Sequence, residues 1–146
     1  MAVFERSIKV DAPMDKVWAM ITNPASWGGW FPDADEITGL EAVQEGAHFQ
    51  WRDGNKTGTG SITKLDTERG LITVVMTEGG RQTEHTFDLD RSGGFLGFGG
   101  NDTSVKYRRE YDAKGGFLGE FVAGGNPVDS IEVKRTLEKI RNLAQG

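Results

Sequence analysis

The sequence changes from a strand pattern to a helix pattern within residues 7–18, which read Ser7-Ile8-Lys9-Val10-Asp11-Ala12-Pro13-Met14-Asp15-Lys16-Val17-Trp18. Before the change, Phe4, Ile8 and Val10 fall on one face of an alternating segment. Alternation of apolar and polar residues over a short run is typical of a strand with one buried face. We therefore expect a strand over about 4–10.

After the change, the spacing of the apolar residues becomes helical. Val17 and Ile21 are four residues apart, so they share one face of a helix. Pro13 suits the first turn of that helix, where its missing N–H has no partner to lose, and Asp11 offers a carboxylate for the N-cap. The pattern predicts a helix over about 13–22.

A second, shorter helix is expected directly afterwards. Asn23 can cap it, and Pro24 can occupy its first position. Trp27, Trp30 and Phe31 follow at helical spacing and form one aromatic stripe. We expect the two tryptophans to be packing residues beneath the short helices.

Glycine is abundant, at 21 of 146 residues, and it gathers in short blocks between β-rich runs. Blocks such as Asp53-Gly54-Asn55 and Glu78-Gly79-Gly80 recur roughly every ten residues or somewhat more, which is the spacing that consecutive hairpins produce. The pattern predicts further strands at about 36–43, 47–53, 57–67, 71–79, 82–91 and 102–113.

The last predicted element is a long helix over about 127–144. Asn126-Pro127-Val128-Asp129 resembles a capping box, with an acid three residues after the cap. One face of the helix carries apolar side chains at a helical period. They are Val133, Leu137, Ile140 and Ala144. A long amphipathic helix can cover one face of an antiparallel sheet, so the whole pattern predicts an α+β fold.

Composition is that of an ordinary globular domain and excludes several classes of site. We expect one domain over 1–146, large enough to bury a core without a staple. The absence of cysteine excludes disulfides, thiolate metal sites and cysteine nucleophiles. The net charge of −5 argues against nucleic acid as a main partner, because phosphate binding needs a concentrated basic face. No signal peptide or membrane-spanning run is apparent, so a cytoplasmic location is expected.

The run I-x-V-x-A-P-x-x-x-V-W over residues 8–18 resembles the start of the START-like, or SRPBCC, superfamily, and the polyketide cyclase/dehydrase-like branch in particular. The resemblance covers nearly the whole chain and is strongest over 7–31 and 126–144. It implies the helix-grip fold, in which a curved antiparallel sheet of six to seven strands wraps around a long C-terminal helix, with two short helices after the first strand. It also implies an internal cavity between the sheet and the helix. The family has no universal catalytic motif, so the resemblance leaves the chemistry open.

Strand parity indicates which side chains would face that cavity. On three of the predicted strands, the inward face combines aromatic rings with a few polar groups, the usual composition of a small-molecule site. Two loops, 92–101 and 115–126, carry phenylalanines on glycine-rich backbone, and in the resembled family the second loop borders the cavity mouth. These rings either close over the opening or anchor the loops to the core. The expected ligand contacts are Phe49, Trp51, His85, Phe87, Tyr107, Arg109, Phe117 and Phe121.

Two of these residues have a purely structural alternative. His85 is either a core histidine hydrogen-bonded to a neighbour, or a hydrogen-bond donor or general acid/base. Arg109 cannot be buried without a partner. It pairs with a carboxylate such as Asp33, Asp35 or Glu120, or it contacts an anionic or carbonyl group of a ligand.

Three functions fit these expectations. The first is binding, or transport, of a hydrophobic small molecule such as a lipid or an aromatic polyketide. The second is a polyketide cyclase or dehydratase, in which His85 or Tyr107 moves protons and Arg109 stabilises a developing enolate. The third is a protein-interaction module, like the co-chaperone relatives of the superfamily, with an unidentified protein partner. Because His48 and His85 lie far apart and no carboxylate spacing completes a metal set, no metal is expected, and no cofactor either.

Overall fold

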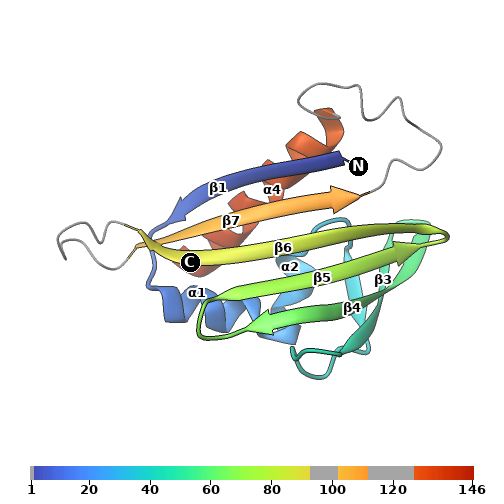
Figure 1. Ribbon diagram of the computed structural model, residues 1–146, viewed down its shortest axis with the longest axis horizontal. Helices are drawn as coiled ribbons and strands as arrows, with labels where there is room; N and C mark the ends of the chain where they lie inside the picture. The colour runs from blue at the N-terminus through green and yellow to red at the C-terminus, as the bar shows by residue number, and fades with distance from the viewer. Residues whose placement is uncertain (1, 93–101, 112–126) are drawn as a thin grey trace.

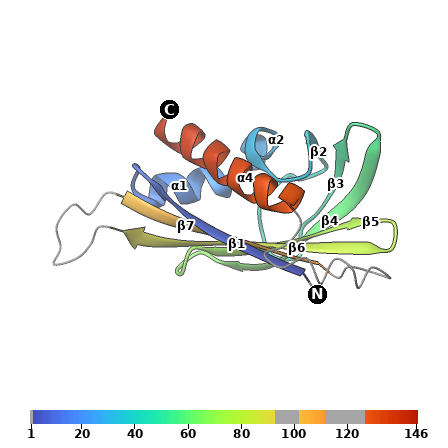
Figure 2. The same cartoon turned by 90° about the horizontal axis from the view of Figure 1, so that it is seen from above.

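The computed structural model of the chain describes residues 2–92, 102–111 and 127–146. Seven strands form one antiparallel sheet in the order β1-β7-β6-β5-β4-β3-β2. The helices of the described part lie on one face of this curved sheet (Figures 1 and 2). The elements are β1 (Ala2–Val10), α1 (Met14–Ile21), η1 (Pro24–Ser26), α2 (Trp27–Trp30), β2 (Glu36–Thr38), β3 (His48–Asp53), β4 (Lys56–Asp66), β5 (Leu71–Glu78), β6 (Arg81–Ser92), β7 (Asp102–Tyr111) and α4 (Pro127–Gln145). This is the α+β arrangement that the sequence pattern predicts and the helix-grip fold that the family resemblance implies.

The start of α1 differs from the expectation. Pro13 stands at the N-cap with an extended backbone, φ −67° and ψ 152°, and no side chain caps the helix, so Asp11 is not its cap. The physical reason is that the residue before a proline is disfavoured in the helical region, so the helix does not extend back through Ala12 to Asp11. The Pro13 carbonyl accepts the first helical N–H groups. Asn23, in contrast, caps η1 as expected, and its side chain accepts the N–H of Ala25.

Most strand predictions agree with the structure within a residue or two, but the strand predicted over 36–43 is wrong in its length. Only Glu36–Thr38 of the expected 36–43 strand pairs with β3. Gly39 has φ +81°, which turns the chain away from the sheet. The capping side chain of Asn126 and the end of the expected 102–113 strand lie outside the described residues.

Helix α4 is packed as its sequence predicts. Val133, Leu137, Ile140 and Ala144 are all buried. The helix contacts β1 and β7 of the sheet as well as α1 and α2. At its end the Gln145 side chain accepts the N–H of Asp11, 2.8 Å away, which ties the last helix to the turn after β1. In the described part of the chain, no helix is long and apolar enough to cross a membrane.

An aromatic cluster fills the middle of the concave face. The cluster consists of Trp27, Trp30, Phe31, Phe49, Phe87 and Tyr107, all of them buried. Trp27 stacks on Phe31 at 4.6 Å between ring centroids, and Phe87 stacks on Tyr107 at 4.5 Å. Ring pairs at these distances stabilise a core beyond the area that they bury.

Two glycines of β4 make room for rings from the neighbouring strand. A Cβ on Gly58 would lie 2.5 Å from the Trp51 indole and would also collide with the Thr77 carbonyl oxygen. A Cβ on Gly60 would overlap the Phe49 ring. Each ring therefore lies over a glycine of β4, because a side chain at that position would overlap the ring. The Trp51 N–H donates to the Thr59 carbonyl at 3.0 Å and fixes the orientation of the indole.

Candidate functional site

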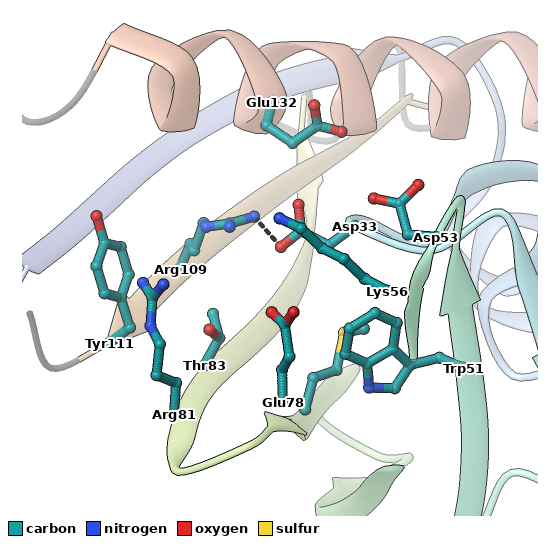
Figure 3. Close-up of a pocket in the computed structure, with 11 residues that line it drawn as sticks. Asp33, Trp51, Asp53, Lys56, Glu78, Arg81, Thr83, Arg109, Tyr111 and Glu132 are labelled. Atoms are coloured by element: carbon teal, nitrogen blue, oxygen red, sulfur yellow. Dashed lines mark ion pairs between the residues drawn. The ribbon is translucent and has the colours of Figure 1, made fainter. Parts of the chain in front are cut away.

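A pocket of about 390 Å³ lies between the concave face of the sheet and the first turns of α4 (Figure 3). Its wall combines an indole and a thioether with many charged groups. Four carboxylates line it, Asp33, Asp53, Glu78 and Glu132, together with three cations, Lys56, Arg81 and Arg109. The remaining lining residues are Trp51, Met76, Thr83 and Tyr111.

Strand register brings these side chains together. Met76 of β5, Thr83 of β6 and Tyr111 of β7 are direct partners in one row across the sheet. The neighbouring row continues through His85 and Arg109. Because alternate residues of a strand share a face, the pocket residues continue the inward rows that the buried core begins. Glu132 completes the pocket from the opposite side, since it projects from α4 toward the sheet (Figure 3).

Arg109 is the most deeply placed charge of the pocket, with 9 % of its surface exposed. Its Nη1 lies 2.5 Å from a carboxylate oxygen of Asp33. Asp33 belongs to the segment between α2 and β2 and has a left-handed backbone, φ +61°. Asp and Asn adopt this conformation more readily than other residues with a side chain. Of the two described carboxylates that the sequence suggests as partners of Arg109, Asp33 is the one that pairs with it, and Glu120 lies outside the described residues.

Behind Arg109 lies a hydrogen-bonded pair that the core encloses completely. His85 Nδ1 and the Tyr107 hydroxyl oxygen are 2.6 Å apart, and both residues have no exposed surface. The Arg109 guanidinium lies near the Tyr107 hydroxyl and acts on its pKa. Either His85 Nδ1 or the Tyr107 hydroxyl can donate the proton in the bond between them. His85 Nε2 has no hydrogen-bond partner within the described ranges.

Burial decides the protonation of this pair. Desolvation lowers the pKa of His85 well below its usual value, and the positive charge of Arg109 lowers it further. Burial also raises the pKa of the Tyr107 hydroxyl, against the opposing effect of Arg109. Both groups are therefore neutral near pH 7.

The structure places the residues expected at the site in two groups. All six described ones face inward, as strand parity predicts. Only Trp51 and Arg109 line the pocket. The others, Phe49, His85, Phe87 and Tyr107, lie in the core beneath it. Phe117 and Phe121, and the loops expected to close over the opening, lie outside the described residues.

Sequence reasoning missed most of the charged wall. Glu78 and Arg81 flank a hairpin turn, as Asp53 and Lys56 do, and turn-flanking charges are usually solvated. The available signal was parity, since Arg81 has the same parity as His85. Glu132 gave no such signal, because its position depends on how α4 crosses the sheet.

The chain belongs to a family described as polyketide cyclase/dehydrase and lipid transport, whose model matches residues 1–145. A comparison with curated proteins by sequence found no match. The family assignment agrees with the resemblance noted in the sequence and with the helix-grip architecture.

Solved structures with the same fold share little sequence with this chain. Truncated norcoclaurine synthase from Thalictrum flavum is similar with a TM-score of 0.70 and 17% identity, over 97% of this chain and 92% of that one. The ZhuI aromatase/cyclase from Streptomyces sp. R1128 has a TM-score of 0.68 and 18% identity, over 99% and 93%. The protein TTHA0849 from Thermus thermophilus has a TM-score of 0.72 and 14% identity, over 99% and 97%. At these identities the likeness supports the fold alone.

Proposed function

We propose that this protein binds a hydrophobic small molecule, such as an aromatic polyketide or a lipid, in the pocket beside Arg109. The observation that carries the proposal is a pocket of about 390 Å³ whose wall pairs the Trp51 indole with a nearly buried guanidinium. The volume lies within the range of about 300–1,000 Å³ that is usual for small-molecule sites. The family description, which names polyketide cyclases and lipid transport, points the same way.

The two lining features suggest how a ligand would lie. The Trp51 ring is held across β4 by Gly58 and by its hydrogen bond to Thr59, so it offers a fixed face for stacking. Arg109 is held by its ion pair with Asp33. A ligand with an apolar body against Trp51 would direct a polar group at the guanidinium. Because both contacts are already in place, binding costs little ordering of the protein.

The test is an amide NMR titration against aromatic polyketides, flavonoids, fatty acids and sterols. We expect shifts to concentrate at Trp51, Arg81, Arg109 and Tyr111. Trp51→Leu should weaken binding by about tenfold, the order of one aromatic stacking contact. Trp18→Phe, on α1 and outside the pocket lining, is the matched control and should bind normally. The absence of amide shift changes with every compound would refute the proposal.

A second function, a polyketide cyclase or dehydratase, is favoured by the connection from Arg109 to the buried pair. Arg109 would touch the substrate and stabilise a developing enolate. Tyr107 and His85 lie behind it, so they would act on the substrate through Arg109 or after a rearrangement. In this function, His85→Ala abolishes turnover of a bound polyketide and preserves its binding. Equal turnover by the unmodified protein and by His85→Ala would contradict the enzymatic function and leave binding as the function of the pocket.

A further inference from the structure

We propose that the pocket selects uncharged ligands that present a carbonyl or hydroxyl group to Arg109, and that it discriminates against carboxylates. The inference rests on the proposed function and adds the chemical class of the ligand. It follows from the way in which the charges around the pocket already compensate one another.

The charge of Arg109 is compensated before any ligand enters. Asp33 lies within ion-pair distance of its guanidinium, at 2.5 Å, and both side chains are at least partly buried. A carboxylate ligand that approached Arg109 would therefore also approach the carboxylate of Asp33. The attraction to one and the repulsion from the other largely cancel, whereas the ligand would still lose its hydration.

The other two cations of the pocket each have a carboxylate opposite them in the sheet. Lys56 pairs in register with Asp53 across the β3–β4 turn, and Arg81 pairs with Glu78 across the β5–β6 turn. Side chains that are direct cross-strand partners lie close enough to interact, and opposite charges there are favourable. Each of these two cations thus has a carboxylate on its own hairpin, and the Arg81 guanidinium also lies over the Tyr111 ring, with 6.0 Å between its Cζ and the ring centroid.

Glu132 leaves the described lining with one more carboxylate than cations. It reaches the pocket from α4, across from Arg109 (Figure 3). Its ion-pair partner Arg135 lies on its own helix, at 3.6 Å, and is largely exposed. A ligand carboxylate would add a like charge to this partly enclosed space, where charges interact more strongly than in water. A neutral carbonyl oxygen avoids that repulsion and still accepts a hydrogen bond from the guanidinium, which has several donors.

The test compares two probes with the same bicyclic skeleton, 2-acetonaphthone and 2-naphthoate, by NMR titration at about pH 7.5. We expect the ketone to bind the unmodified protein at least about tenfold more tightly. Asp33→Asn should raise the affinity for naphthoate relative to that for the ketone by at least about fivefold. Asparagine tolerates the backbone of residue 33, φ +61°, as aspartate does, so the variant changes charge without adding strain.

Two further variants keep the test decisive. Asp88→Asn removes a carboxylate that is paired with Arg69 outside the pocket, at 3.3 Å, and should leave the ratio of the two affinities unchanged. If Asp33→Asn does not fold, Glu132→Gln should shift the ratio in the same direction by about threefold. Naphthoate binding as tightly as the ketone would overturn this inference alone. Failure of both probes to bind at millimolar concentration would overturn the proposed function together with it.

Discussion

Acidification should destabilise this protein through His85. In the folded state, burial and Arg109 hold the pKa of His85 well below its usual 6.5. The unfolded chain exposes the imidazole and therefore binds the proton first as the pH falls. The contribution of His85 to stability is accordingly complete above about pH 6.5 and is lost as the pH falls toward the folded-state pKa.

The magnitude follows from proton linkage. One pKa unit corresponds to about 1.36 kcal/mol, and this is also the limiting loss of stability per pH unit for one proton. If folded His85 stays neutral throughout, the loss between about pH 6.5 and 5.5 is about 1 kcal/mol, because the unfolded imidazole titrates with its midpoint at the start of that interval. Against a total of about 5–15 kcal/mol, this is measurable.

The assay is urea unfolding, followed by tryptophan fluorescence, at steps from about pH 7.5 to 5.5. His85→Gln supplies the reference, because it keeps every carboxylate and removes only the buried imidazole. A pH-independent loss of stability in that variant does not affect the test, because the comparison uses the change in the free energy of unfolding with pH. The exposed His48 provides a matched control, and His48→Gln should keep the slope of the unmodified protein. Parallel curves for the unmodified protein and His85→Gln would refute the reasoning.

Two further predictions concern the core beneath the pocket. Tyr107→Phe deprives the buried His85 Nδ1 of its partner at 2.6 Å, so the free energy of unfolding should fall by about 1–3 kcal/mol in urea titrations; a loss below about 0.5 kcal/mol would contradict the hydrogen-bond assignment. Gly60→Ala places a Cβ against the Phe49 ring and should cost about 1–3 kcal/mol by thermal unfolding, whereas Gly28→Ala, with no atom within 4 Å, should cost less than about 0.5 kcal/mol. Similar losses in the two alanine variants would show that the ring contact is not what requires glycine.

Local periodicity was sufficient to predict most of the architecture and the direction of the key side chains. The inward orientation of His85 and Arg109 follows from the two-residue repeat of a strand, which tertiary structure cannot reverse without a bulge. The buried face of α4 follows in the same way from the helical repeat. Where a local rule failed, at Asp11, a competing local rule on the residue before proline prevailed.

The sequence by itself thus determined where most strands and the long helix lie and which face each strand residue occupies, because these depend on local periodicity. The pairing of β1 with β7, which are far apart in the chain, was decided in the tertiary structure. Only the tertiary structure decided where the pocket lies and how it is charged. Trp30 and Phe31 come from the short helix and its end, and Glu132 comes from α4. The way in which the helices cross the curved sheet decides which inward strand positions these rings cover. It also decides which inward positions lie near Glu132 or Asp33. That crossing results from packing between segments far apart in the chain, which no local pattern encodes.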